Sequence, residues 1–175
     1  MLAQAGYSVA VTLVGSVYPG TEWYERELRA TAASLPAGVE VEFAGFSTNI
    51  WANLAHCDVA VVPSRLNESF GNTAVEGVLA LRPVVASDNS GLREAVGPYA
   101  TARLVPPDSA RALADALIGV RESWETMRAN VAAGRSRALD RHAPERYRAA
   151  VSRAVTGVGT CGGSETDTGV IGPMR

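Results

Sequence analysis

The order of apolar and polar positions along the chain predicts strands that alternate with helices. Short apolar runs are typical of strands covered on both faces, and longer stretches with apolar residues every three or four positions indicate helices. The predicted strands are Ser8–Val14, Val39–Ala44, Asp58–Val62, Pro83–Ala86 and, as an edge strand, Arg103–Val105. The predicted helices are Glu22–Ser34, Thr48–Ala55, Asn72–Leu81, Gly91–Val96, Asp108 or Ser109 to Val120, Arg121–Leu139 and Pro144–Val155.

This alternation predicts an α/β fold, a Rossmann-like parallel sheet with helices on both faces. Residues 1–155 are predicted to form one domain, which is long enough to bury a core. Thr21, and either Thr48 or Asn49, are predicted helix N-caps. From Thr156 to Arg175 the chain is rich in Gly, Thr and Ser and has no apolar period, so we predict a disordered tail without an assigned function.

Charge and cysteine content narrow the class of protein. The net charge of −2 does not predict a nucleic-acid partner, and all 16 cationic residues are Arg, so the chain offers no lysine chemistry. Cys57 and Cys161 lack metal or redox spacing, which favours a reducing cytoplasm, and His56 with Cys57 is interpreted as a packed pair. The apolar run Val9–Val14 is too short to cross a membrane and is predicted to be a buried strand.

The strongest chemical signal lies between Ser64 and Glu76. Two glutamates, Glu68 and Glu76, flank the turn at Gly71, which follows a strand and opens a helix. N–H groups at a helix start attract phosphate, and carboxylates beside them can accept hydrogen bonds from sugar hydroxyls. Glu76 shares a helix face with Asn72 and Thr73, so the stretch predicts a site for a phosphorylated, polyhydroxylated ligand.

At this point the chain resembles the nucleotide-sugar-binding C-terminal domain of retaining GT-B-fold glycosyltransferases of the family-4 type. The resemblance extends from about Gly6 to Ala150. It rests on motifs in the family's order and spacing, among them an E-x7-E pair: Pro63-Ser64, Glu68-Ser69-Phe70-Gly71, Glu76, Pro83–Ser87 and Gly91–Glu94. The resemblance implies the donor-binding half of an enzyme that transfers a sugar from a nucleotide diphosphate sugar. The resemblance also implies that no metal or other cofactor is needed, and the lack of an Asp-x-Asp motif agrees with this expectation.

The resemblance also implies roles for individual residues. Glu68 is the expected catalytic-site residue, near the donor sugar, and Glu76 is expected to bind the ribose. The remaining expected ligand-binding residues are Phe46 near the base, Ser69, Phe70, Gly71, Asn72 and Thr73 around the diphosphate, and Ser90 and Gly91 near sugar and phosphates. Simpler interpretations stay open: Phe70 as a core anchor, which we favour, Asn72 or Thr73 as helix caps, and Glu76 as a solvated surface residue.

The sequence departs from the family in four respects. Leu81 stands where the family usually has Gly, Ser90 replaces the first Gly of a Gly-Gly pair, the basic Arg/Lys pair is missing, and so is its strand. That strand belongs between Ser8–Val14 and Asp58–Val62, and its absence leaves unpaired backbone groups that cost about 1–3 kcal/mol each when buried. Three outcomes are open: the two flanking strands pair with each other, a partner chain supplies the strand, or the chain folds poorly.

The family's acceptor domain is not in this sequence either, so the expected partners are a nucleotide-sugar donor and an acceptor-binding domain on a missing segment or partner chain. Any peripheral contact with the inner face of the membrane is expected only through that missing half, and the isolated chain is expected to be inactive. Two alternatives stay open, a nucleotide-sugar epimerase of the same fold and a non-catalytic nucleotide-sugar-binding fragment.

Overall fold

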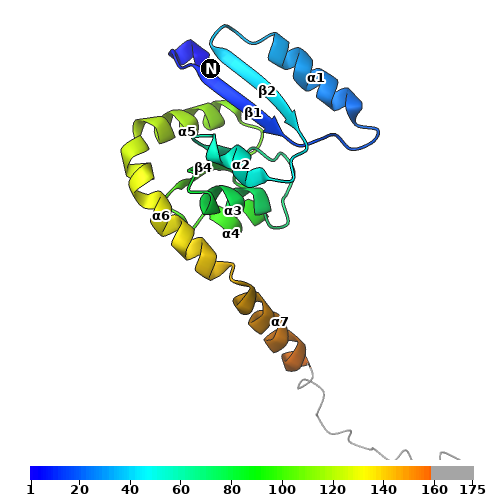
Figure 1. Ribbon diagram of the computed structural model, residues 1–175, viewed down its shortest axis with the longest axis vertical. Helices are drawn as coiled ribbons and strands as arrows, with labels where there is room; N and C mark the ends of the chain where they lie inside the picture. The colour runs from blue at the N-terminus through cyan, green and yellow to red at the C-terminus, as the bar shows by residue number, and fades with distance from the viewer. Residues whose placement is uncertain (159–175) are drawn as a thin grey trace, which may run out of the picture. The chain divides into compact units, whose positions relative to one another are not determined.

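The computed structural model describes residues 1–158, which form strands and helices in alternation (Figure 1). The strands are β1 (Val9–Val14), β2 (Val39–Gly45), β3 (Ala60–Val62), β4 (Val84–Ser87) and β5 (Ala102–Val105). The helices are a 3-10 turn at Ala3–Ala5, α1 (Glu22–Ala33), α2 (Ile50–Ala55), α3 (Asn72–Leu79), α4 (Ser90–Val96), α5 (Ala110–Glu122), α6 (Trp124–Arg141) and α7 (Pro144–Val158). The chain divides into two compact units, Met1–Ala138 and Leu139–Arg175.

The strands form two parallel sheets instead of one. β1 pairs with β2, and a second sheet has the order β3-β4-β5. The α/β class with parallel sheets and flanking helices is therefore confirmed, and β5 is an edge strand as predicted. β1 and β3, the strands on either side of the expected missing strand, have not re-paired with each other and each ends its sheet.

The prediction that β1 is a buried strand is wrong. Val11, Leu13 and Val14 are 36–38% exposed, and the first buried residue in the chain is Leu54. The physical reason is that β1 has β2 as its one paired strand. A two-stranded sheet cannot enclose its own apolar side chains and is only marginally stable by itself.

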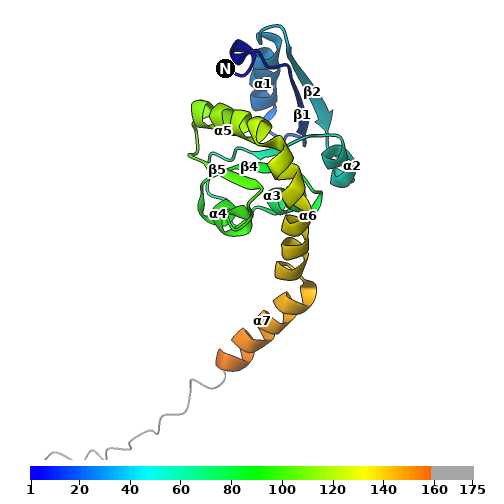
Figure 2. The same cartoon turned by 90° about the vertical axis from the view of Figure 1, so that its left-hand side faces the viewer.

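The three-stranded sheet carries a core on each face. Val84 and Ala86 of β4 pack into a cluster with α3 and α4, whereas Val85 packs into a second cluster with α5 and Met127 of α6. Alternate residues of a strand point to opposite faces, so β4 is covered on both sides (Figure 2). This sheet is the rigid base on which the loops after β3 and β4 are held.

Asn49 is an N-cap as predicted, and Ser109, one of two residues predicted to begin its helix, is another. The side chains of Asn49 and Ser109 accept hydrogen bonds from the N–H groups of Ala52 and Ala112, at 3.3 and 3.2 Å. Thr21 occupies the N-cap position of α1 as predicted, but its side chain makes no capping bond, because its hydroxyl donates to the carbonyl oxygen of Tyr18 at 2.8 Å.

The backbone conformation of Leu81, just after α3, is one that Gly adopts more easily than Leu. Its φ is 62°, in the left-handed region, and the N–H groups of Leu81 and Arg82 donate to the carbonyls of Val78 and Gly77. These two bonds form a Schellman motif, whose left-handed position is usually Gly. The bulky residue is accommodated by a strained backbone at the helix end, and its side chain is 37% exposed.

We therefore expect Leu81→Gly to raise the free energy of unfolding by about 1 kcal/mol, because Gly adopts this conformation without the penalty of a Cβ. Chemical denaturation measures the change. The matched control is Leu139→Gly inside α6, where the same substitution should lower stability by about 1 kcal/mol. A loss of stability at Leu81 as large as that of the control would contradict strain at this turn.

Helix α7 belongs to the second unit and extends to Val158, beyond the domain end predicted at 155. The rest of the predicted tail lies outside the described residues. Tyr147 and Val151 of the apolar stripe of α7 are 73% and 43% exposed.

Among the helices of residues 1–158, none combines the length and the apolar character needed to span a bilayer.

Candidate functional site

The loop after β3, residues 63–71, carries the first glutamate and is called the glutamate loop below. The Ser64 hydroxyl donates a hydrogen bond of 2.7 Å to Oε1 of Glu68, and both side chains are partly buried. This bond fixes one carboxylate oxygen and leaves the second, Oε2, for a ligand. Sequence reasoning used Ser64 only as part of a motif and missed this contact.

The start of α4 holds the glutamate loop from the other side. The Gly91 N–H donates to the carbonyl oxygen of Glu68 at 3.1 Å, and Nδ2 of Asn89 donates to the carbonyl oxygen of Leu66 at 3.0 Å. The predicted residues Glu68 and Gly91 are therefore brought together, although 23 positions separate them. Asn89 was not predicted, but an Asn directly before a helical pattern is a recognisable cap signal.

The N-terminus of α3 follows this loop directly. Gly71, the residue before the helix, has φ 89° and no side chain that could cap it. The interpretation of Asn72 or Thr73 as helix caps is wrong, because both residues lie inside the helix and are exposed. The first N–H groups of a helix have no intrahelical partner, so this turn has the chemistry of an anion site.

Glu76 lies one turn further along α3. Ala74, Val75 and Val78 face the core, whereas Asn72 and Thr73 are exposed and Glu76 is partly buried between the two environments. The predicted common face of Asn72, Thr73 and Glu76 therefore agrees with the burial pattern.

Phe70 is not a core anchor, so the interpretation favoured from sequence is wrong. Its side chain is 45% exposed. Leu92 of α4, which is fully buried, occupies the space under the turn instead, and a Cβ added at Gly71 would lie 2.6 Å from its side chain. The aromatic ring is therefore partly exposed, two positions after Glu68 in the chain.

The other predicted residues fall at two places. Ser90 is the exposed first residue of α4, and Ser69 is exposed in the glutamate loop. Phe46 follows β2 of the two-stranded sheet and is 74% exposed. Its side chain has the exposure that a stacking contact requires, but Glu68 follows β3, which belongs to the other sheet.

Two arginines near the glutamate loop are engaged in ion pairs. Arg65 contacts Asp108 at 2.8 Å, and Arg93 contacts Asp88 at 2.6 Å. The hydrogen bond from Arg93 lowers the pKa of the Asp88 carboxyl below its ordinary value. Both arginines are exposed, so these pairs are weak and can exchange for a bound anion.

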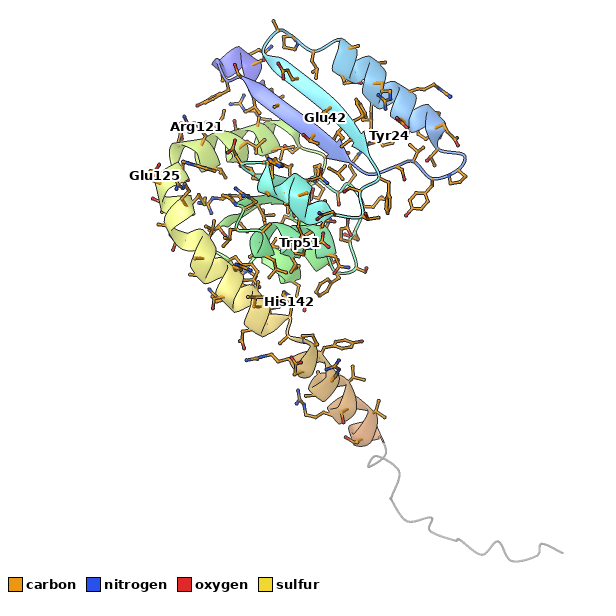
Figure 3. The ribbon with its side chains drawn as sticks, in the orientation of Figure 1. Tyr24, Glu42, Trp51, Arg121, Glu125 and His142 are labelled. Atoms are coloured by element: carbon orange, nitrogen blue, oxygen red, sulfur yellow. The ribbon has the colours of Figure 1, made fainter. Side chains whose placement is uncertain are left out.

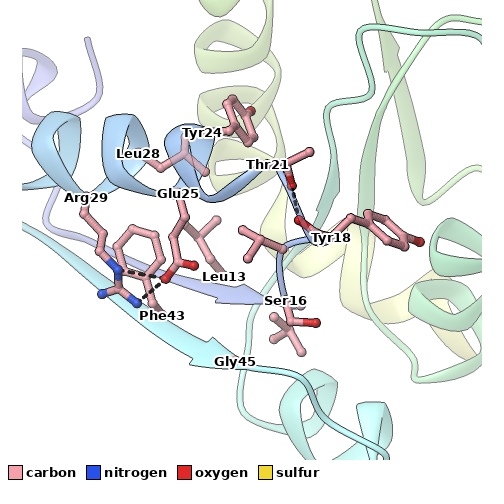
Figure 4. Close-up of a pocket in the computed structure, with 13 residues that line it drawn as sticks. Leu13, Ser16, Tyr18, Thr21, Tyr24, Glu25, Leu28, Arg29, Phe43 and Gly45 are labelled. Carbon is pink, nitrogen blue, oxygen red and sulfur yellow. Dashed lines mark hydrogen bonds and ion pairs between the residues drawn. The ribbon is translucent and has the colours of Figure 1, made fainter.

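A pocket lies between α1 and the carboxyl ends of β1 and β2 (Figure 4). It encloses about 350 Å³, and its wall is mainly apolar, with Leu13, Tyr24 and Phe43 among the lining residues. Arg29 lies over the Phe43 ring at 4.2 Å and bonds to Glu25. The sequence did not predict this cavity, because it depends on how α1 packs on the sheet.

Figure 3 draws the side chains of the described residues. Within residues 1–158, no group of three or more His, Cys, Asp or Glu residues could hold a metal ion. Cys57 is partly buried, its thiol donates to the Leu54 carbonyl at 3.3 Å, and burial raises the pKa of the thiol. This contact agrees with a packing role for Cys57.

Polar residues thus follow the neighbouring parallel strands β3 and β4, next to an α3 N-terminus without a side-chain cap, which is the usual place of ligand sites in open α/β sheets. A family model described as "Glycosyl transferases group 1" matches residues 2–137. The chain therefore belongs to the group 1 glycosyl transferase family, and its fold is that of the C-terminal domain of GT-B glycosyltransferases.

Curated relatives are similar to parts of the chain. A phosphatidyl-myo-inositol mannosyltransferase of Mycobacterium leprae is 34% identical over 114 residues, which is 63% of this chain and 29% of the relative. The protein of the same name from Mycolicibacterium smegmatis is 39% identical over 85 residues, covering 49% of this chain and 22% of the relative. The putative glycosyltransferase EpsD of Bacillus subtilis is 34% identical over 80 residues, covering 46% and 21%.

Solved structures show the same fold. Anabaena Alr3699/HepE in complex with UDP superposes with a TM-score of 0.77 at 25% identity, covering 89% of this chain and 43% of that chain. Sucrose-phosphate synthase of Thermosynechococcus elongatus gives 0.69 at 23% identity, covering 90% and 48%. The chain thus spans less than half the length of each of these proteins.

Proposed function

We propose that this chain is the donor-binding half of a retaining, family-4 type glycosyltransferase that uses a nucleotide diphosphate sugar. The observation that carries the proposal is the glutamate loop. Its Glu68 is tied to Ser64 and Gly91, and the loop ends at the uncapped N-terminus of α3, with Glu76 one turn away. Carboxylates on both sides of an anion site suit a sugar–diphosphate–ribose ligand.

In this proposal, the bond between the anomeric carbon and the diphosphate oxygen breaks, and the carbon forms a bond to an acceptor hydroxyl oxygen with retention of configuration. The hydroxyl proton passes to the leaving diphosphate. The first N–H groups of α3 stabilise the charge that develops on the leaving diphosphate. Glu68 faces the sugar and Glu76 the ribose hydroxyls, while Ser69, Phe70, Gly71, Asn72 and Thr73 surround the phosphates. Ser90 and Gly91 border the sugar, and Phe46 borders the base. The diphosphate is held without a metal.

The partners belong to the same proposal. The UDP complex of HepE and the mannosyltransferase names of two relatives support a nucleotide-sugar donor. An acceptor-binding domain would come from a further segment or a partner chain, and turnover would require it. We place the protein in the cytoplasm, with any contact to the inner membrane face made through that acceptor-binding part.

The test compares two single variants. Glu76→Ala is expected to weaken binding of a nucleoside diphosphate by about tenfold or more, because a charge-assisted hydrogen bond contributes roughly 1.5–3 kcal/mol. Glu68→Ala is expected to leave that affinity nearly unchanged and to weaken binding of the matching nucleotide sugar. Calorimetry with UDP and UDP-glucose measures both affinities, and GDP and ADP extend the nucleotide panel.

Glu122→Ala, at the exposed end of α5, removes the same charge away from the site and should change neither affinity. Equal affinity of the wild type and Glu76→Ala for every nucleoside diphosphate that binds would remove the ribose role. Failure of the wild-type chain to bind any nucleotide or nucleotide sugar would overturn the proposed donor site as a whole.

A further inference from the structure

Asn89 is a buried polar residue between the candidate site and α4. Only 6% of its surface is exposed, and both ends of its amide are used. Oδ1 accepts a hydrogen bond of 3.4 Å from the Leu92 N–H, which caps α4, and Nδ2 donates 3.0 Å to the Leu66 carbonyl oxygen. An amide is the side chain that provides an acceptor and a donor in this way, whereas a carboxylate or a hydroxyl does not provide both at these positions.

The glutamate loop depends on such polar contacts for its position. Leu66 is 83% exposed and Phe70 is 45% exposed, so the apolar side chains of the loop are not buried anchors. The loop is instead joined to the start of α4 at two alternate residues, by Asn89 at Leu66 and by the Gly91 N–H at Glu68. The Ser64 hydroxyl then orients the carboxylate of Glu68 within this frame.

We propose that Asn89 is a positioning residue that sets where Glu68 meets the donor sugar, by joining the N-terminus of α4 to the glutamate loop. The inference rests on the proposed function, which gives Glu68 its ligand. Asn89 acts through Leu66 and the loop backbone and does not itself touch the sugar. Its loss should therefore affect recognition of the sugar more than recognition of the diphosphate, which binds at α3.

The experiment replaces the amide by groups that keep the helix cap. Asn89→Ser and Asn89→Asp each retain an oxygen that can accept from Leu92 N–H. The Asp carboxylate has no donor for the Leu66 carbonyl, and the Ser hydroxyl ends one bond short of the position of Nδ2. Calorimetry on the 175-residue chain compares UDP-glucose with UDP. We expect both variants to lower the affinity for UDP-glucose relative to that for UDP about threefold to tenfold, the range of one hydrogen bond, with a smaller loss of UDP affinity because the end of the loop also adjoins the phosphates.

Hydrogen exchange provides a readout that needs no ligand. In Asn89→Ser, the amide of Gly91, which bonds to Glu68, should exchange faster, while the amide of Leu92 keeps its protection because Ser still caps the helix. The matched control is Asn49→Ser, the same change at the N-cap of α2, which should leave the affinity ratio unchanged.

The outcomes separate the inference from the proposed function. Binding of both ligands by the wild type with an unchanged ratio in Asn89→Ser would overturn the positioning role alone. An equal loss of affinity for both ligands would also overturn it, since that result indicates a general structural role. Binding of neither ligand by the wild type would overturn the donor site, while the Gly91 amide would still report whether Asn89 fixes the loop.

Discussion

Replacing Gly91 with Ala is expected to displace the glutamate loop and to lower the free energy of unfolding by about 2–3 kcal/mol. A Cβ built at Gly91 would lie 2.8 Å from both the carbonyl carbon of Glu68 and the backbone nitrogen of Phe70. These neighbours are main-chain atoms, which cannot rotate away as a side chain can. Relief therefore requires that the loop and α4 move apart.

The same displacement should reduce affinity for a nucleotide sugar at least tenfold, since it separates Glu68 from Gly91 and moves both away from α3. Calorimetry with UDP-glucose and chemical denaturation give the two measurements. The matched control is Gly119→Ala in α5, where an added Cβ meets nothing within 4 Å. There Ala should raise stability by about 0.5–1 kcal/mol, because Gly is a poor residue in a helix.

A stable Gly91→Ala variant with wild-type affinity would show that the loop moves without consequence, and it would remove the close approach of Gly91 to Glu68 as a requirement of the site. Loss of stability with retained affinity in the folded fraction would limit Gly91 to a role in packing. Loss of affinity at preserved stability would show that Gly91 matters for ligand binding and not for packing.

Local patterns in the sequence predicted most elements because they depend on neighbouring residues. The apolar run at Val84 marks β4, and Asn49 and Ser109 mark the starts of α2 and α5. The left-handed turn at Leu81 agrees with the Gly that the family favours there. Each of these features is decided within about one turn of helix or one strand.

Features that depend on distant partners were not predictable in the same way. Whether Phe70 or Leu92 fills the space under Gly71 depends on how α4 approaches the loop, and a resemblance in motif order does not reveal this. The bond from Asn89 to Leu66 likewise joins positions 23 residues apart. β1 is exposed because β2 alone pairs with it in a two-stranded sheet, although its own residues are those of a buried strand.

The region of β1, β2 and α1 is expected to open locally long before the rest of the first unit unfolds. No residue in these elements is buried, whereas β4 is buried throughout. β3 forms an open edge of the second sheet. A cavity of about 450 Å³ lies there, lined by residues that include Val59, Leu117 and Trp124. Buried apolar contacts are what resist local opening, so their distribution predicts which amides exchange first.

Native-state hydrogen exchange on the 175-residue chain measures this difference. Amides of β1 and β2 should exchange at least about 100-fold faster than those of β4, because a two-stranded sheet is marginal in water. The comparison is internal, since Val11 pairs with Val41 and Val85 with Arg103 in the same parallel geometry. Equal rates in β1 and β4, with the same dependence on denaturant, would show that both sheets unfold as one cooperative unit.

A longer polypeptide that supplies a parallel strand to β1 and β3 should slow exchange in both strands, because it pairs their open edges and fills the core beside β3. Unchanged exchange in that polypeptide would mean that the added strand does not join the two sheets, and that the β3-β4-β5 sheet carries the proposed donor site by itself.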